Sequence, residues 1–382
     1  MADAAEVVIV GGGPVGAALA LMLASAGCET VVVEPREAVA GPLRPVALSY
    51  GSRLLLERLE VWVRLLPATA IGRIHVSQRG GFGRAMLTAA DQALPALGYV
   101  VDYRRVHGAL GGLLARQPRA RVLRAAVNRI VAGPDCASVE YSSGESTGTL
   151  QARLVVVADG GAMHDDVRAR IVDYGQTAVV ATVLAEQPHR NTAFERFTTS
   201  GPLALLPCDD RYALVWSVRP ERALELCELP EGAFSGELER EFGGRLGTFS
   251  GVAQRAAFPL ALRVTDDSVL ARVVRVGNAA QVLHPVAGQG LNLGLRDAWD
   301  LGGEIARAMP GDVGSAAVVA AFRARRRFDR SVSIRLTDAL VRGFSNDSRL
   351  LRIARGVGLT LLGCAPPARD LMARRMTFGF RG

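Results

Sequence analysis

Residues 6–24 read EVVIVGGGPVGAALALMLA: a β-branched run, a glycine-rich turn and a stretch of helix-forming residues. Gly11, Gly13 and Gly16 give it the spacing Gly-x-Gly-x-x-Gly in the required order of strand, turn and helix. In this motif the first glycine permits a tight turn, the second lets a pyrophosphate approach the backbone, and the third allows close packing of helix on strand. The stretch therefore predicts a Rossmann-like nucleotide-binding unit.

The next predicted strand, residues 30–33, leads directly into Glu34, 18 residues after Gly16. A carboxylate at this place is expected to accept hydrogen bonds from a ribose and to repel a 2′-phosphate, which favours FAD or NAD over NADP. The chain carries no second fingerprint of this kind. Further glycine-containing segments lie far along the chain, at 154–160 and 274–298, and together they suggest one long FAD bound by distant parts of the sequence.

Composition and charge restrict the class of protein. The chain has 382 residues, 49% of them apolar and 21% charged, which excludes a disordered or collagen-like chain and a disulfide miniprotein. All 45 basic residues are Arg, and residues 323–382 hold 14 of them against four Asp. A basic tail could face anionic lipid, an acidic partner or nucleic acid, but no nucleic-acid motif is present, so no nucleic-acid partner is expected.

The five cysteines are scattered, with no Cys-x-x-Cys and no metal-ligand spacing to a histidine, so we expect a reducing, cytoplasmic compartment and no metal site. Residues 7–28 contain no charge and are long enough for a membrane span. Because Gly11 to Pro14 interrupt them, they are interpreted as a buried strand, a turn and a buried helix.

The remaining chain divides into a β-rich middle and a helical end. Residues 173–265 alternate in β fashion and predict a sheet that covers the flavin, with the substrate cavity between the domains. Glu195 and Arg196 lie in this part and could line the substrate site, although alternating charges on a strand are more typical of a solvated face. Helices are expected at 316–332 and 349–362, the second lying either on a membrane surface or against the FAD domain or a partner.

Several segments together carry a family resemblance. They are LVVVADG (154–160), VRVGNAAQVLHPVAGQGLNLGLRDA (274–298), RPVALSYG (44–51), IHVSQRG (74–80), AFERFT (193–198), GPLA (201–204) and TDAL (337–340). The chain resembles the group A flavin monooxygenases, which are single-component aromatic hydroxylases. Within them it is similar to the ubiquinone-biosynthesis hydroxylases, above all those acting on 2-polyprenyl-6-methoxyphenol, from residue 5 to its end.

The resemblance implies an α/β fold. A Rossmann-like FAD-binding domain of the GR2 type is interleaved with a β-sheet substrate domain and followed by a C-terminal helical region. The expected boundaries are 1–72, 99–172 and 266–322 for the FAD-binding domain, 73–98 and 173–265 for the substrate domain, and 323–382 for the basic helical region.

The resemblance also implies an activity. FAD would be reduced by NADPH (NAD(P)H more generally), and a flavin C4a-hydroperoxide formed with O2 would transfer oxygen to the polyprenylated phenol. The implied surroundings are the cytoplasm, the surface of the inner membrane and a ubiquinone-biosynthesis protein complex. Two alternatives stay open: a sister hydroxylase acting at another ring position, and a non-catalytic flavoprotein-like scaffold of the quinone-synthesis assembly.

Position by position, the resemblance implies residues that contact FAD. The residues at the pyrophosphate are Gly11, Gly13, Pro14, Val15 and Gly16, and those near the adenosine ribose are Glu34, Pro35 and Arg36. Arg44 is implied at the flavin phosphate or ribityl chain, and Asp159, Gly160 and Asn278 are further FAD contacts; the residues at the isoalloxazine are Pro285, Gly288, Gln289, Gly290, Leu291 and Asn292. Arg104 is also a candidate, although the corresponding family position falls on Tyr103.

Two residues are catalytic candidates, and one segment departs from the family. His284 and Pro285 are expected at the flavin face, and His284 is expected to titrate near neutral pH, with a positioning or packing role as the alternative to proton transfer. The family pattern Asp-Gly-x-x-Ser-x-x-Arg would need Ser at Met163 and Arg at Asp166, with Arg168 as a candidate replacement. NADPH docking is the function that this departure affects.

Overall fold

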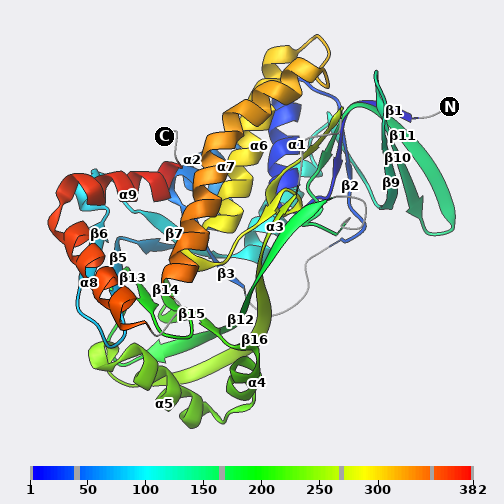
Figure 1. The fold of residues 1–382 in the computed structure, drawn as a ribbon. Helices are drawn as coiled ribbons and strands as arrows, with labels where there is room; N and C mark the ends of the chain where they lie inside the picture. Colours follow the sequence, from blue (N-terminus) through cyan, green and yellow to red (C-terminus); the bar gives the residue numbers. More distant parts are fainter. Residues whose placement is uncertain (1–2, 38–43, 163–167, 266–270, 345–347, 380–382) are drawn as a thin grey trace.

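The computed structural model describes residues 3–37, 44–162, 168–265, 271–344 and 348–379. It contains three sheets flanked by helices, and the two larger sheets mark the two expected domains (Figure 1). Within these residues no helix is both long enough and apolar enough to span a membrane.

The first sheet is the core of the FAD-binding domain. Its strand order is β8-β2-β1-β11-β10-β9, with β17 beside β11. Strands β1, β2, β8, β11 and β17 are parallel, and β9 and β10 extend the sheet in antiparallel fashion. The bounds are β1 (Asp3–Val10), β2 (Thr30–Val33), β8 (Ala120–Leu123), β9 (Ala126–Ala132), β10 (Ala137–Ser143), β11 (Ser146–Val157) and β17 (Val273–Arg275).

Residues 7–10 of β1 are buried on both faces, which explains their unbroken apolar sequence. Val7 and Ile9 pack with helices of one layer, whereas Val8 and Val10 pack with side chains of β10 and β11. The helical layer consists of α1 (Pro14–Ser25), α3 (Tyr103–Leu114), α6 (Gln289–Ala308) and α7 (Ala316–Phe344). This arrangement confirms the expected Rossmann-like fold.

The second sheet, which we call the substrate sheet, has the order β18-β16-β12-β15-β14-β13-β5-β6. Its bounds are β5 (Arg73–Gln78), β6 (Arg84–Thr88), β12 (Ala169–Ala185), β13 (Thr192–Phe197), β14 (Pro202–Cys208), β15 (Arg211–Val218), β16 (Phe249–Thr265) and β18 (Gln281–Val282). Strands β5 and β6 come from early in the chain, so the two domains are interleaved as expected. The individual domain boundaries stay a prediction, since β12 runs continuously across residue 172.

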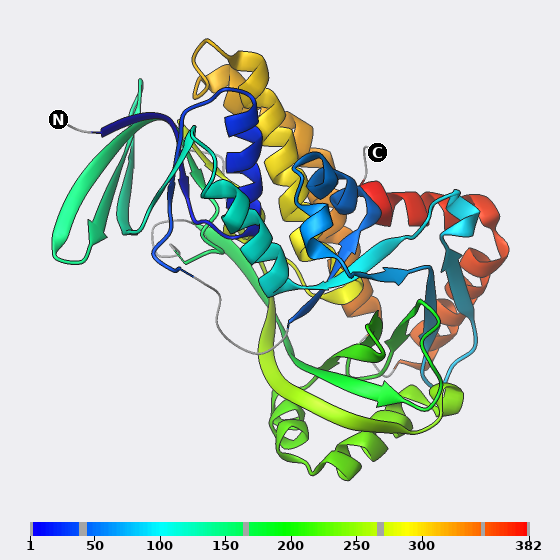
Figure 2. The same ribbon diagram turned by 180° about the vertical axis from the view of Figure 1, so that it is seen from behind.

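Two helices cover the outer face of the substrate sheet. Helices α4 (Pro220–Glu228) and α5 (Glu231–Phe242) lie under the long strands β12 and β16, at the end of the molecule away from α1 (Figures 1 and 2). Phe234 and Leu238 of α5 pack there with Tyr212 and Trp216 of β15. The other face of the sheet is thereby directed toward the FAD-binding domain.

A small third sheet and short helices complete the described fold. The third sheet has the order β3-β7-β4, with β3 (Pro45–Ser49), β4 (Thr69–Ile71) and β7 (Gly98–Asp102). Helix α2 (Tyr50–Arg58) follows β3 directly. Five 3₁₀ turns are described: η1 (Trp62–Leu65), η2 (Ala90–Gln92), η3 (Gly244–Leu246), η4 (Gly277–Ala279) and η5 (Val286–Gly288).

The C-terminal region is helical, as expected, and longer in its first helix. Helix α7 continues to residue 344 instead of ending at 332, α8 (Arg349–Cys364) agrees with the prediction, and α9 (Pro366–Phe378) completes the region. Helix α8 packs on the substrate-sheet edge at β6, and α9 packs on α2, with the rings of Tyr50 and Phe378 6.1 Å apart. Helix α8 also contacts α7, so it packs on both the substrate sheet and a helix of the FAD-binding layer, and its expected place on a membrane surface or a partner stays a prediction.

A buried ion network joins α6, α7 and the η4 turn. Asp297 of α6 accepts hydrogen bonds from the Gly277 N–H (3.0 Å), from Gln281 (2.7 Å) and from Nε of Arg326 (2.5 Å). Arg326 also pairs with Asp329 at 2.5 Å, and Arg330 donates to the carbonyls of Thr265 and Ala280. Burial opposes the charge on Arg326, but the carboxylates around it outweigh this and raise its pKa. Part of the basic tail thus serves as internal counterions.

Replacing Arg326 should therefore be costly. Arg326→Met leaves Asp297 and Asp329 buried without their shared cation, and we expect a loss of about 3–5 kcal/mol in the free energy of unfolding. Arg327→Met is the matched control because Arg327 is exposed on the same helix. Urea unfolding of the full chain measures both; equal midpoints for the two variants would contradict the prediction.

Candidate active site

The fingerprint glycines occupy three different environments. Gly11 has φ of +105°, and an added Cβ would lie 2.5 Å from the carbonyl oxygen of Ala158. A Cβ on Gly16 would lie 2.0 Å from the carbonyl oxygen of Gly11. A Cβ on Gly13 would meet nothing within 4 Å, and Gly13 lines the main cavity at the N-terminus of α1. Two glycines thus allow close backbone packing, and the third leaves space that fits a pyrophosphate.

Glu34 lies next to this turn as a buried carboxylate, 3% exposed. Oε2 of Glu34 accepts a hydrogen bond from the Gly12 N–H at 2.9 Å. Oε1 of Glu34 accepts two, from the backbone N–H of Arg36 at 3.0 Å and from Nε of Arg36 at 2.9 Å. Burial acts to raise the pKa of Glu34, but these hydrogen bonds and the Arg36 charge outweigh it and lower the pKa. The group is therefore ionised and suited to accept hydrogen bonds from a ribose.

A cavity of about 1020 Å³ runs from this turn, between the two domains, to α8 and α9. That volume lies at the upper end of the range for small-molecule and cofactor sites. Its described walls include these predicted site residues: Gly13, Pro14, Val15, Arg36, Arg44, Asp159, Gly160, Asn278, Pro285, Gly288, Gly290 and Leu291. The remaining predicted residues are not among the cavity walls: Gly11, Gly16, Glu34, Pro35, Arg104, His284, Gln289 and Asn292.

The region around Arg44 shows which neighbour faces the cavity. The Arg44 guanidinium lies 5.1 Å from the centre of the Tyr103 ring, and both residues line the cavity. Arg104 instead pairs with Asp102, with 2.7 Å between Nη2 and Oδ2. The structure therefore places Tyr103, and not Arg104, at the wall, in agreement with the family position. A direct contact of Arg104 with FAD stays a prediction that this geometry does not favour.

Asn292 holds the glycine-rich loop in place from behind. Its Oδ1 accepts the backbone N–H of Ser49 at 2.8 Å and the hydroxyl of Ser52 at 2.7 Å. Its Nδ2 donates to the carbonyls of Ala47 and Gly288. Asn292 thus fixes β3 against the loop, while Gly288, with φ of +60°, makes the turn that the loop requires. Sequence reasoning missed Ser49 and Ser52, which carry no motif of their own.

His284 lies behind the cavity wall, 1% exposed. Its Nδ1 accepts the Val286 N–H at 3.1 Å, so its Nε2–H donates to Oε1 of Gln176 at 3.2 Å. Burial lowers the pKa of His284 to about 4. The expected titration near neutral pH is therefore wrong, and the geometry favours the positioning role.

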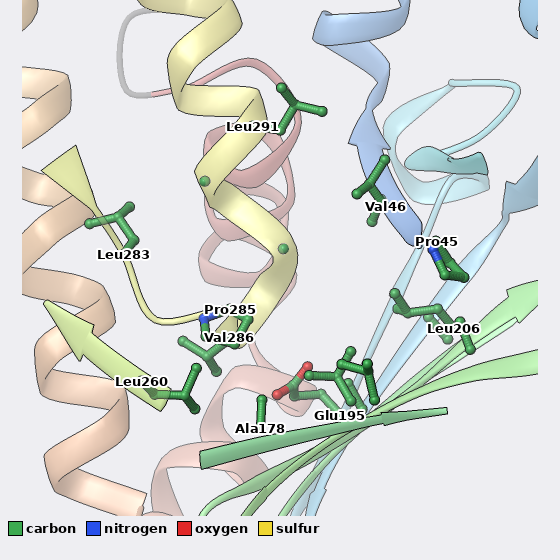
Figure 3. Close-up of a pocket in the computed structure, with 18 of the residues that line it drawn as sticks. Pro45, Val46, Ala178, Glu195, Leu206, Leu260, Leu283, Pro285, Val286 and Leu291 are labelled. Atoms are coloured by element: carbon green, nitrogen blue, oxygen red, sulfur yellow. The ribbon is translucent and has the colours of Figure 1, made fainter. Parts of the chain in front are cut away.

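Glu195 and Arg196 lie on opposite sides of β13. Glu195 lines the cavity, and Figure 3 shows its carboxylate pointing into it. Arg196 is half-buried on the other side of β13 and donates to the carbonyl of Glu241 at 3.1 Å. The alternative that these residues line the substrate site therefore fits Glu195, whereas the solvated face is wrong for both, since β13 lies between β14 and β5 and neither side chain is exposed.

The family departure at Met163 and Asp166 lies outside the described residues. Asp159, just before it, accepts the Gly161 N–H at 2.8 Å and lines the cavity. Arg168 is exposed at the start of the strand region that follows. The suggestion that Arg168 replaces the family arginine stays a prediction.

Comparisons with known proteins agree with this fold and site. A family model described as FAD binding domain matches residues 4–333, so the chain belongs to that family. Solved structures with the same fold include p-nitrophenol 4-monooxygenase PnpA of Pseudomonas putida, with a TM-score of 0.77, 19% identity and full coverage of both chains. The flavin-dependent brominase Bmp2 has a TM-score of 0.79 at 14% identity, covering 99% of this chain and 94% of that one.

Curated relatives narrow the class. Ubiquinone hydroxylase UbiL of Rhodospirillum rubrum is 37% identical, covering 97% of this chain and 89% of that protein. The 3-demethoxyubiquinol 3-hydroxylase of Escherichia coli is 32% identical, covering 93% of each. Human mitochondrial COQ6, a ubiquinone biosynthesis monooxygenase, is 28% identical over 96% of this chain and 91% of its own. The chain is an FAD-dependent monooxygenase of the ubiquinone-biosynthesis hydroxylase family, and such enzymes use NAD(P)H and O2.

The open space around Gly13 predicts that a substitution there weakens FAD binding without lowering the stability of the fold. Gly13→Ala adds a Cβ where the protein leaves open space, so we expect normal stability and a dissociation constant for FAD raised about tenfold or more, or about 1.4 kcal/mol. Gly108→Ala on α3 is the matched control, since its Cβ also meets nothing within 4 Å. Fluorescence titration of apoprotein with FAD gives both constants; unchanged affinity in Gly13→Ala would contradict the pyrophosphate assignment.

His284 predicts a pH dependence of stability. Between its unfolded pKa of 6.5 and its folded pKa of about 4, the unfolded chain binds a proton that the folded protein does not. Stability therefore falls as pH falls through this window, by up to about 1.4 kcal/mol per pH unit from this group. His284→Gln should reduce that slope in urea unfolding between about pH 7 and about pH 5. An identical slope in wild type and variant would show that His284 does not stay neutral in the fold.

Proposed function

We propose that this monooxygenase hydroxylates the ring of a polyprenylated methoxyphenol on the route to ubiquinone. The observation that carries the proposal is the single cavity that runs from the nucleotide turn at Gly13 to apolar side chains of α8 and α9. Such a cavity has room for a cofactor at one end and for an aromatic ring with an apolar tail at the other. The names of the UbiL and COQ6 relatives support the same pathway.

The described residues fit FAD, which would supply reduction by NAD(P)H and oxygen transfer to the ring. Gly13, Pro14 and Val15 would hold the pyrophosphate, and Glu34 the adenosine ribose. Arg44 and Asn278 line the next part of the cavity, and Pro285, Gly288 and Leu291 the wall beyond it. The substrate-sheet walls, including Val180, Leu206 and Phe258, would exclude water from the reacting ring.

The ring position is the finer part of the proposal. The family resemblance favours 2-polyprenyl-6-methoxyphenol as substrate. A sister reaction at another ring position is the alternative, supported by the name of the Escherichia coli relative, a 3-hydroxylase of demethoxyubiquinol. Product regiochemistry distinguishes the two.

Helix α8 supports a location at the cytoplasmic face of the inner membrane. Leu359 and Leu362 line the cavity, whereas Leu350, Ile353, Val357 and Leu361 are exposed, Leu350 at 80%. These four residues recur at helical spacing and form one apolar stripe. The stripe would lie on the lipid surface in which a polyprenyl phenol resides, and partners from a ubiquinone-biosynthesis complex would meet the enzyme there.

The direct test uses purified protein with FAD, NADPH and a short-chain 2-prenyl-6-methoxyphenol in air. We expect a bound flavin spectrum, NADPH oxidation that the phenol accelerates, and a product heavier by one oxygen atom, detected by mass spectrometry. Flavin binding without accelerated oxidation would favour the scaffold alternative over the hydroxylase. The corresponding prenyl phenol without the methoxy group serves as the specificity control.

A further inference from the structure

One end of the main cavity lies between the C-terminal helices and the edge of the substrate sheet, where α8 and α9 lie beside β5 and β6 (Figures 1 and 2). We call this end the α8 passage. Most of the described side chains that line it are aliphatic or thioether groups: Ile74, Val76, Leu87, Leu340, Leu351, Ala354, Leu359, Leu362, Met372 and Met376. Gly358 and Arg355 complete its α8 wall, and Nη1 of Arg355 donates to the carbonyl of Gly343 at 3.0 Å. Polar wall residues such as Thr182 and Gln254 belong to β12 and β16, toward the opposite edge of the substrate sheet.

The α8 passage opens to solvent along α8. Leu351 lines the cavity and is nevertheless 46% exposed. Ala354 and Gly358 are also both exposed and part of the cavity wall, whereas Leu359 is buried on the inner side. Val357 of the exposed apolar stripe directly precedes Gly358. An apolar chain that leaves the cavity at this opening therefore meets the apolar stripe on the outer side of α8.

The length of the passage exceeds what an aromatic ring needs. Leu351 and Leu362 both line the cavity and are three helical turns apart, a rise of about 16 Å along α8. The hydrophobic effect favours burial of apolar surface along the whole of this length. A ring would occupy only part of it, whereas an extended apolar chain attached to the ring would fill it. The shape and the chemistry of the wall thus fit a long hydrocarbon chain.

Gly358 is a glycine of α8 that backbone packing does not explain. A glycine inside a helix lowers helix stability relative to alanine, so a structural reason for it is expected. Gly356 and Gly363 have such a reason, because a Cβ on either would lie 2.8 Å from a backbone carbonyl oxygen of the β5–β6 hairpin. A Cβ on Gly358 would meet nothing within 4 Å, and Gly358 lines the cavity. The space beside Gly358 is therefore part of the opening.

From these observations we propose that the α8 passage binds the polyprenyl chain of the substrate and that Gly358 is a specificity-determining position where the chain leaves the protein. The inference rests on the proposed function and deepens it, because it assigns the chain to named walls of the cavity. Binding involves no covalent step. The chain gains affinity by burial of its apolar surface between α8, α9 and the β5–β6 hairpin, and its far end leaves beside Gly358.

The first test measures how affinity depends on chain length. The ligands are 2-methoxyphenols with no tail, one isoprene unit or three isoprene units at position 6, titrated calorimetrically into the oxidised, FAD-loaded full chain without lipid or detergent. In wild type we expect Kd to fall about tenfold or more from the tail-less ring to the three-unit ligand. Gly358→Glu should raise Kd for the three-unit ligand about tenfold or more, because its carboxylate must lose water beside an apolar chain. Kd for the tail-less ring should change less than twofold.

Thr360→Glu is the matched control, since Thr360 is exposed on α8 and is not among the described cavity walls. It adds the same charge to the same helix and should leave the chain-length dependence as in wild type. Leu351→Glu, at the exposed end of the passage, is an independent second variant and should act as Gly358→Glu does. The same chain-length dependence in wild type, Gly358→Glu and Leu351→Glu would overturn the proposal.

The second test locates the chain directly. A 2-methoxyphenol whose three-unit tail ends in a diazirine is bound to the FAD-loaded protein, irradiated and digested with trypsin. The sequence places Gly358 in the tryptic peptide 356–369. We expect adducts on this peptide, and an excess of the three-unit ligand without diazirine should suppress them. Adducts confined to peptides outside α8 and α9, or adducts that this competitor does not suppress, would refute the passage.

These tests separate the inference from the proposed function. If wild type hydroxylates the phenols but binds the three ligands with equal affinity, the α8 passage fails alone. If the tail binds as described but none of the phenols is hydroxylated, the proposed function fails while the passage stands. If none of the ligands binds or reacts, both are rejected.

Discussion

The buried pair of Asp297 and Arg326 is the interaction on which the cofactor side of the cavity depends. Two charges removed from water are tolerated only when they are close together and their remaining hydrogen-bonding atoms are satisfied. Asp297 meets this condition by accepting from Arg326, Gln281 and the Gly277 N–H. The same carboxylate therefore ties α7 to α6 and fixes the turn that presents Asn278. The glycine-rich loop from Pro285 onward starts only a few residues after this turn, so the position of the turn also determines where the loop begins.

Local motifs were the part of the molecule that the sequence could predict. A side chain at position 16 would collide with the carbonyl of Gly11, five residues earlier, so the requirement for glycine at 16 arises within the motif itself. Glu34 likewise accepts a hydrogen bond from the N–H of Gly12, which follows the neighbouring parallel strand. Periodicity likewise predicted individual strands and helices, whereas the α/β fold with interleaved domains was implied by the family resemblance.

Contacts between distant segments could not be predicted in this way. Charge counting placed Arg326 in a basic tail that could face lipid or an acidic partner, but its partner Asp297 lies 29 residues earlier on another helix. Strand alternation shows which residues share a face, yet it cannot show that β5 covers the edge of β13 and makes Glu195 a cavity residue. For His284, the deciding hydrogen-bond acceptor is Oε1 of Gln176, 108 residues earlier. These errors share one cause, since burial of a polar side chain is decided by elements far apart in the chain.

The far wall of the cavity shows how an apolar space of this size is kept open. Close backbone approach at two glycines helps to set the position of α8. A Cβ on Gly356 or on Gly363 would lie 2.8 Å from the carbonyl oxygen of Phe82 or of Arg84, respectively. These glycines are seven residues apart, two helical turns, and so lie on one face of α8. Because the helix rests on the β5–β6 hairpin through glycine, its neighbouring face can keep Leu359 and Leu362 at the cavity without filling it. Larger residues at the two glycines would push α8 away from β6 and open the wall, so the enclosed shape of the substrate end depends on residues that never touch the substrate.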